Sequence, residues 1–161
     1  RHRDPVDARH VEPCYSGITS INLNRKWAQG GMNMPLTLDE ANRMMQSAIN
    51  KAKELNINMS IAVCDAGGHL LAFNRTEGCI WISAVAAQGK AGTATGFARP
   101  SGEISPDSPV IQSIMASHGG MIPAQGAVPI FRGGELIGSI GGSGGTGQQD
   151  EDCAKAGLEA L

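Results

Sequence analysis

The sequence predicts an α+β fold in which helices flank a central antiparallel sheet. Two pairs of strand-like segments turn at adjacent glycines, Gly67-Gly68 in the first pair and Gly133-Gly134 in the second, which is typical of β-hairpins. Segments with helical spacing of apolar residues lie before, between and after the hairpins. This order of helix, hairpin, two helices, hairpin and helix favours an antiparallel sheet over alternating parallel units.

The first helix is predicted to begin at Thr37. Thr37 and Glu40 occupy the two positions of a capping box, in which each side chain bonds to the backbone N–H of the other residue. Apolar residues then recur at steps of three and four and form one stripe: Leu38, Ala41, Met45, Ala48, Ile49, Ala52 and Leu55. Asn56 and Asn58 end this helix, and the strands of the first hairpin follow over 59–65 and 69–75.

The second half of the chain is predicted to hold three helices and the second hairpin. Residues 80–97 are rich in alanine, which suits a helix that approaches its neighbours closely. Residues 98–109 contain several prolines and form a loop, and a short helix follows over 110–118. The second hairpin has strands over 124–132 and 135–140, and the last helix begins at about Asp150.

A glycine-rich run links the last strand to the last helix. Glycines at such a junction either turn the backbone or let a ligand approach exposed amides. We expect Asp150, Glu151 and Asp152 in the first turn of the helix, where carboxylates complement the positive helix end and repel a phosphate. A structural turn is therefore favoured over a ligand loop, and without a P-loop motif we predict no nucleotide site.

Composition suits one globular domain with an appendage. The chain has 161 residues, of which 41% are hydrophobic but only 4% aromatic, so the core must be built from Ile, Val, Leu, Ala and Met. Residues 1–34 lack a clear period and are predicted to form an N-terminal arm or a tag-like extension, with Trp27 as its large apolar anchor. Residues 35–161 are predicted to form the domain.

Charge and cysteine content limit the partners. Acidic residues outnumber basic ones in 35–161, and no basic patch with neighbouring aromatics is present, which argues against a nucleic-acid partner. Cys14, Cys64, Cys79 and Cys153 form no CxxC pair and no metal-finger spacing, so we expect reduced, mostly buried thiols and no metal site. These features favour the cytoplasm, and no run approaches the roughly 20 apolar residues of a membrane span.

Four motifs, in this order, resemble those of the GlcG/HbpS family. They are LTLDEA from Leu36, IAVCDAGGHLLAFNRTEG from Ile61, KAGTA from Lys90, and IGSIGGSGG from Ile137, the last followed by three acidic residues. The resemblance covers nearly all of residues 35–161. Departures include Arg75-Thr76-Glu77-Gly78, where the family usually has Arg-Met-Asp-Gly.

The resemblance implies a fold, an assembly and a set of ligands. The fold is a profilin-like three-layer α-β-α sandwich that assembles into homo-oligomers, here a tetramer or an octamer. The family includes glycolate-operon proteins, haem-binding and haem-degrading proteins, and a domain attached to a propanediol-utilisation cobalamin adenosyltransferase. Haem or a corrinoid is therefore the implied cofactor class.

The first hairpin offers three candidate ligand-binding residues. Asp65 ends a strand before the Gly67-Gly68 turn, where a carboxylate either accepts hydrogen bonds from turn amides or acts as a general base or charge partner. Arg75 and Glu77 stand near the other end of the hairpin and pair either with each other or with a ligand. Arg75 is the better anion anchor, since its guanidinium can bind a carboxylate through two hydrogen bonds.

Lys90 and Thr93 form a candidate polar pair on the alanine-rich helix. They are three residues apart and so share a face. A lysine among small apolar residues needs a partner, which is either a ligand carboxylate, such as a haem propionate, or a structural carboxylate. Thr93 has the alternative of bonding to its own preceding turn.

His69 and His118 are the candidate haem ligands in the predicted domain. His69 begins a strand after a turn and His118 ends a helix before two glycines, positions at which solvent-facing histidines are also common. No CxxCH motif occurs, so any haem would be bound non-covalently. His2 and His10 fall in the predicted arm.

Two functions from different classes follow, and a third stays open. The first is an oligomeric, non-catalytic accessory protein that binds a haem-like or corrinoid cofactor and serves glycolate, diol or glycerol utilisation. The second is a small enzyme that degrades haem or acts on a hydroxy acid or aldehyde, with Asp65, Lys90 and Glu77 as acid-base candidates. The third is a purely structural assembly component, which would explain the small-residue faces.

Overall fold

A computed structural model describes residues 34–161. The predicted N-terminal arm, with Trp27, His2, His10 and Cys14, lies outside the described residues. Its assignment as an arm or extension stays a prediction.

The described elements follow the predicted order and confirm the α+β class. In chain order they are α1 (Leu38–Glu54), β1 (Ser60–Asp65), β2 (Leu70–Arg75), α2 (Ile82–Phe97), the 3-10 turn η3 (Ser101–Glu103), α3 (Pro109–His118), β3 (Ala127–Arg132), β4 (Glu135–Ser143) and α4 (Gly147–Leu158). The predicted capping box is present, because the Thr37 hydroxyl accepts from the Glu40 N–H and the Glu40 carboxylate accepts from the Thr37 N–H.

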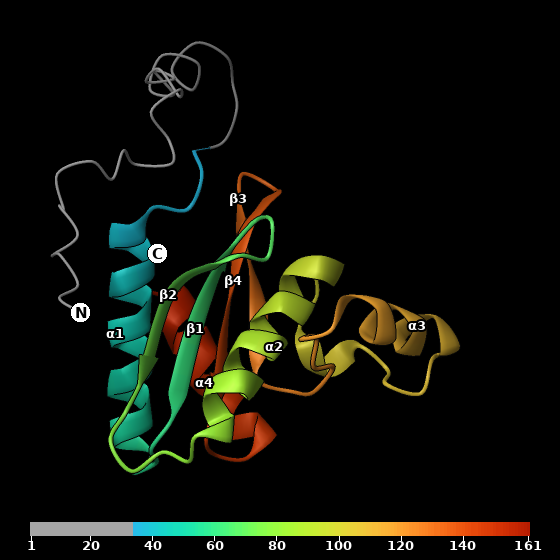
Figure 1. Cartoon of the computed structure of the whole chain (residues 1–161). Coiled ribbons are helices and arrows are strands. Elements are labelled where there is room, and N and C mark those ends of the chain that lie inside the picture. The colour runs from blue at the N-terminus through green and yellow to red at the C-terminus, as the bar shows by residue number, and fades with distance from the viewer. Residues whose placement is uncertain (1–33) are drawn as a thin grey trace, which may run out of the picture. The chain divides into compact units, whose positions relative to one another are not determined.

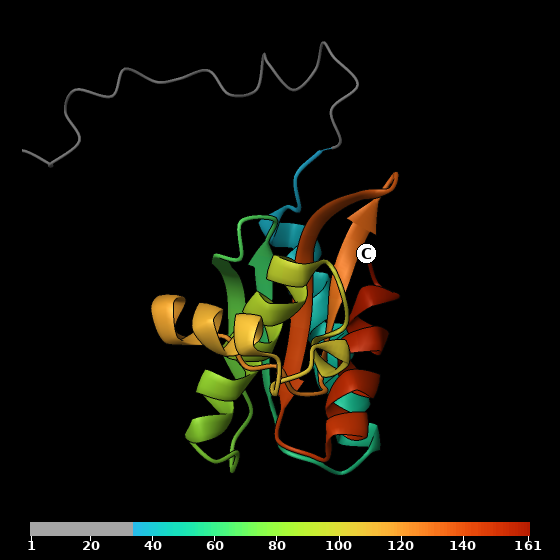
Figure 2. The same cartoon turned by 90° about the vertical axis from the view of Figure 1, so that its right-hand side faces the viewer.

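The four strands form one antiparallel sheet in the order β2-β1-β4-β3. Helices α1 and α4 cover one face and α2 covers the other, which gives three layers (Figures 1 and 2). Helix α3 projects beyond α2, on the side away from the sheet (Figure 1). Strands β2 and β3 are the two edges, and β3 carries Pro129 opposite Ser139 of β4.

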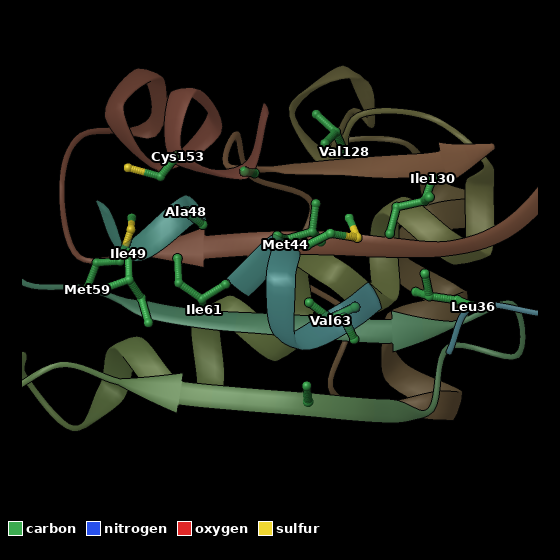
Figure 3. Close-up of a cluster of buried hydrophobic side chains, with 14 of the residues drawn as sticks. Leu36, Met44, Ala48, Ile49, Met59, Ile61, Val63, Val128, Ile130 and Cys153 are labelled. Carbon is green, nitrogen blue, oxygen red and sulfur yellow. The ribbon is translucent and has the colours of Figure 1, made fainter. Parts of the chain in front are cut away.

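The main core lies between the sheet and the layer of α1 and α4. Its largest fully buried side chains are Met44, Met59, Ile61, Ile130 and Ile140, and the first four are labelled in Figure 3. As the composition predicted, this core is aliphatic and rich in methionine and alanine. Burial of each large apolar side chain contributes about 1.5–3 kcal/mol.

The layer between the sheet and α2 is built from smaller side chains. Ala62, Cys64, Ala87 and Ala91 form its apolar cluster. A Cβ atom on Gly141 of β4 would lie 2.8 Å from the Ala87 carbonyl oxygen, so glycine is needed for this approach. The alanine-rich composition of α2 therefore serves close contact with the sheet.

The glycine-rich run differs from the prediction in two ways. Strand β4 continues to Ser143, because Gly141 and Gly142 stay paired with β1. Helix α4 begins at Gly147, where the Thr146 hydroxyl caps the Gln149 N–H. As a result Asp150 is the only one of the three expected carboxylates in the first turn.

Candidate functional site

A groove of about 700 Å³ lies on the α2 side of the molecule. Its walls are the turn between β1 and β2, the outer face of α2 and the segment that follows α3. This volume falls within the range of about 300–1,000 Å³ found for small-molecule sites. The lining residues are Gly67, Gly68, His69, Val85, Gln88, Gly89, Gly92, Gly96, His118, Gly119, Gly120 and Met121.

Glycines on one side of α2 form the floor of the groove. Gly89, Gly92 and Gly96 recur at steps of three and four and so share a face. At Gly89 a Cβ atom would lie 2.5 Å from the Gly120 carbonyl oxygen, so glycine is needed for the segment after α3 to cross the helix. At Gly92 a Cβ atom would meet nothing within 4 Å. Packing therefore does not explain why position 92 is glycine. Stability does not explain it either, because glycine inside a helix costs about 1 kcal/mol relative to alanine.

The two candidate haem ligands meet at this groove. His69 follows the β1–β2 turn, and His118 ends α3, so they come from segments distant in the sequence but line one cavity. The His69 side chain is 83% exposed and its Nδ1 lies 3.4 Å from Oδ1 of Asp65. The His118 Nδ1 lies 3.1 Å from the Ser117 hydroxyl. Both rings are open to a ligand.

Asp65 organises the turn beside His69. Its Oδ1 accepts hydrogen bonds from the N–H groups of Gly67, at 2.8 Å, and His69, at 2.9 Å. Its side chain is 46% exposed. The turn-stabilising alternative considered for Asp65 is therefore present in the structure, and the same oxygen faces the His69 ring.

Lys90 meets a structural carboxylate on α4. Its Nζ lies 2.7 Å from Oδ2 of Asp150 and 3.3 Å from the Gly142 carbonyl oxygen. Both side chains of the ion pair are buried, at 8% and 3% exposure. Of the two alternatives for Lys90, this is the structural one, and its role as an anchor for a ligand carboxylate stays a prediction that requires the pair to open.

The Asp150 carboxylate also holds the glycine-rich run. Its Oδ1 accepts the Gly145 N–H at 2.9 Å. Burial raises the pKa of Asp150, and the hydrogen bonds from Lys90 and the Gly145 amide oppose that rise. Gly126 is essential beside the pair, because a Cβ atom there would lie 2.8 Å from both the Lys90 Nζ and the Asp150 Cβ.

Thr93 holds the segment after α3 against α2. Its hydroxyl donates to the Gly89 carbonyl oxygen and accepts from the Ile122 N–H, both at 2.8 Å. The Ile122 N–H also lies 3.1 Å from the Gly89 carbonyl oxygen. Thr93 is buried and does not line the groove, so it positions the segment after α3.

Arg75 and Glu77 lie apart from the groove. Both are exposed. Arg75 ends β2 whereas His69 precedes its start, and a six-residue strand spans roughly 17–20 Å. Among residues 34–161 no ion pair joins Arg75 to Glu77, and their predicted ligand contacts stay predictions.

Cysteines and metal ligands add no second site within the described range. Cys64 and Cys153 are free and buried, and burial raises the pKa of each thiol to about 11. In the part of the chain from residue 34 onward, no three His, Cys, Asp or Glu side chains gather as a metal site would require. Within the same part, every helix is too short or too polar to cross a lipid bilayer.

Sequence reasoning missed the groove and its glycine floor. The available signal was the spacing of Gly89, Gly92 and Gly96, which places bare backbone along one face of a helix. Met121 also lies in the lining. The other walls of the groove are brought to α2 by tertiary packing, so the helical pattern of α2 alone could not predict the groove.

Fold and site together define a class of protein. It is a three-layer α+β sandwich domain with an uncharged groove flanked by two histidines. The lining contains no Asp, Glu, Lys or Arg, which is unlike a site for phosphates or other strongly charged ligands.

The chain belongs to the HbpS-like family, since the family model described as "Haem degrading protein HbpS-like" matches residues 36–159. Among curated relatives, the protein GlcG of Escherichia coli is 33% identical over 106 residues, which are 66% of this chain and 79% of GlcG. The corrinoid adenosyltransferase PduO of Citrobacter freundii is 26% identical over 132 residues, which cover 80% of this chain. This chain spans only 39% of the length of PduO.

Solved structures agree with this assignment. A double mutant of HbpS from Streptomyces reticuli matches with a TM-score of 0.72 and 29% identity, over 83% of this chain and 94% of that chain. The haem complex of PduOC matches with a TM-score of 0.72 over 80% of this chain and 96% of that chain. At 24% identity the PduOC match concerns the fold alone.

Proposed function

We propose that this protein binds a haem-like or corrinoid cofactor non-covalently in the groove, as an oligomeric accessory protein. The observation that carries the proposal is the meeting of His69 and His118 at one uncharged groove of about 700 Å³. Imidazole is a common axial ligand of haem iron, and an uncharged lining suits the apolar face of a macrocycle. Membership of a haem-related family supports this choice.

The residues of the groove fit a tetrapyrrole better than a phosphorylated ligand. The surface of α2 is open at Gly92, where nothing lies within 4 Å of a Cβ position, and Val85 and Met121 add apolar contacts. The lining holds no Lys or Arg, so the carboxylates of a haem would stay in water. The solved haem complex of PduOC, a domain of the same fold, supports haem as the ligand to test first.

Self-association is part of the proposal, and the surface around α2 and α3 supports it. Helix α3 has ten residues, none of them buried, and a helix of that length is marginal on its own in water. No Asp, Glu, Lys or Arg occurs from Pro109 to Phe131, and depletion of charge is typical of interface cores. Ile80, Trp81 and Val110 add exposed apolar area, at 67%, 70% and 66% exposure.

A second copy of the chain is the partner that we propose for this surface. Light scattering coupled to size-exclusion chromatography should give a mass of several chains, and Trp81→Glu should lower it. The matched control is Lys53→Glu, an exposed site on α1. A wild-type protein that elutes as a monomer at micromolar concentration would remove self-association from the proposal.

Haem degradation is the second candidate, and the description of the family favours it. The groove brings no acid-base pair to the histidines beyond Asp65. Degradation would consume the Soret band and give a linear tetrapyrrole in the presence of oxygen and a reductant, whereas a carrier would leave the band unchanged.

The link to glycolate, diol or glycerol utilisation rests on likeness to proteins such as GlcG and PduO.

The test is a titration of the purified full chain with haemin, followed through the Soret band, with cobalamin as a parallel ligand. A saturating end point that is lost in the His69→Ala, His118→Ala double variant is expected. A gradual rise without saturation, equal in wild type and double variant, would mean adventitious association of haem and would overturn the proposal. Saturation by cobalamin alone would keep the groove and replace haem by a corrinoid.

A further inference from the structure

We propose that His69, and not His118, binds the iron of the tetrapyrrole through Nε2, and that Asp65 is the positioning residue that holds the His69 ring through Nδ1. This inference rests on the proposed haem-binding function and goes further by assigning each group a role. His69 would be the residue that touches the cofactor metal, whereas Asp65 would act only through His69.

The first argument is the geometry of the turn. The Asp65 Oδ1 lies 3.4 Å from the His69 Nδ1 while it accepts the N–H groups of Gly67 and His69. The carboxylate is thus fixed by two backbone hydrogen bonds before any ligand arrives. A histidine that binds metal through one ring nitrogen usually donates the other N–H to a carboxylate or carbonyl. Asp65 and His69 supply both parts, and the ring is 83% exposed on the groove.

The second argument is the space kept beneath the ring. A Cβ atom on Gly67 would lie 2.8 Å from the His69 Nδ1 and 2.9 Å from its Cε1. Any other residue at position 67 would require the imidazole to shift from this position. Glycine at position 67 therefore leaves room for the imidazole beside Asp65.

The third argument is the contrast with His118. Its Nδ1 faces only the hydroxyl of its neighbour Ser117, at 3.1 Å, and a hydroxyl rotates freely and carries no charge. His118 ends α3, a helix with no buried residue, so nothing comparable fixes its ring. His118 lines the opposite wall and would contact the macrocycle without being the required ligand.

The experiment uses the full chain loaded with haemin. His69→Gly should lose the bound-haem absorption spectrum, and added imidazole should restore it by replacing the missing side chain at the iron. His118→Gly should keep the wild-type spectrum without imidazole. Asp65→Asn is the informative positioning variant, because an amide oxygen can still accept the two turn N–H groups while the negative charge is lost.

For Asp65→Asn we expect a saturating titration, a more positive reduction potential of the bound haem and faster haem transfer to apomyoglobin, by about 10- to 100-fold, the usual effect of losing such a partner. A role in the turn alone would not move the potential. Glu77→Gln, an exposed carboxylate outside the groove, is the matched control.

The outcomes separate the inference from the proposed function. If wild type does not saturate with haemin, the proposed function fails and the inference with it. If wild type saturates and His69→Gly keeps its spectrum, haem binding stands and His69 is not the ligand. If His69→Gly responds to imidazole but Asp65→Asn has the wild-type potential and transfer rate, the positioning role of Asp65 is overturned.

Discussion

On one face of the sheet, α1 and α4 cover a layer of methionine and isoleucine, whereas on the other face α2 lies against the strands through alanine, serine and glycine. The first face holds Met44, Ile61 and Ile140, all fully buried. On the second face Ser139 and Thr95 bond to each other at 2.7 Å, and Ser139 also donates to the Ala91 carbonyl oxygen at 2.8 Å.

This difference indicates that one face of the sheet mainly stabilises the fold, whereas the helix on the other face helps to form the groove. Bulky side chains on the α1 and α4 face exclude water and supply most of the apolar burial. On the α2 face, small residues bring the helix close to the sheet, hydrogen bonds replace apolar bulk, and Lys90 reaches a buried carboxylate on α4. The outer side of α2 then has room for a groove floored by glycine.

The largest expected effect comes from the buried ion pair between Lys90 of α2 and Asp150 of α4. Asp150→Ala should lower the free energy of unfolding by about 3–5 kcal/mol, because Lys90 would stay buried without its carboxylate. Urea denaturation at pH 7 measures this change. Glu151→Ala is the control on the same helix, since its partner Lys155 is half exposed and the loss should stay below about 1 kcal/mol. Equal losses in the two variants would show that the buried pair contributes little.

Truncation on the opposite face should come next. Met44→Ala is expected to destabilise the protein by about 2–5 kcal/mol, because it leaves a cavity in the main core. Met45→Ala, at a half-buried neighbouring position, is the control and should cost clearly less. Thermal unfolding followed by circular dichroism compares them, and a loss for Met44→Ala no larger than that of the control would contradict the picture of a tightly packed layer.

Two glycines on α2 should respond in opposite directions. Gly92→Ala is expected to raise stability by up to about 1 kcal/mol, because the site has open space and alanine favours the helix. Gly89→Ala should lower stability, since the new methyl group would meet the Gly120 carbonyl oxygen. Urea denaturation gives both values. Gly92→Leu should in addition weaken haemin binding, and unchanged binding would place the ligand elsewhere.

The smallest expected effect is a pH dependence at the start of α1. The hydrogen bond from the Thr37 backbone, helped by Arg132, lowers the pKa of Glu40 below its ordinary value of 4.5. Its stabilisation is therefore complete above about pH 4.5 and is lost as the pH falls through the lowered value.

Glu40→Gln should cost about 0.5–1 kcal/mol at pH 7, as other capping interactions do, and this difference from wild type should vanish in more acidic solution. The matched control is Asp39→Asn, an exposed neighbour. Denaturation curves at several pH values would reject this account if the difference between wild type and Glu40→Gln stayed constant with pH.

The sequence carried most of the fold because local signals coincided with tertiary packing. The capping box at Thr37 and the Gly-Gly turns each act over a few residues, so they could be identified directly. The start of α4 was misplaced because Thr146 and Gln149 form a second capping box that glycines conceal. The extra length of β4 arises from pairing with β1, which no local pattern encodes.

The site was predictable only in part. His69, His118 and Asp65 could be chosen by residue type and turn position, and the structure places all three at or beside one groove. The sequence predicted that Lys90 needs a carboxylate partner. It could not identify Asp150 as that partner, because Asp150 lies 60 positions away along the chain. The groove itself depends on how the segment after α3 crosses α2, which long-range packing decides.

Pro129 on the edge strand β3 has a consequence for how copies of this protein can meet. Proline lacks the N–H that an added strand would need, so it is tolerated at a sheet edge and discourages further strand addition there. Growth of the sheet from β3 into a neighbouring molecule is thereby disfavoured. Contacts between copies at this edge would then depend on side chains rather than on backbone hydrogen bonds, which leaves β2 as the edge at which strand addition could occur.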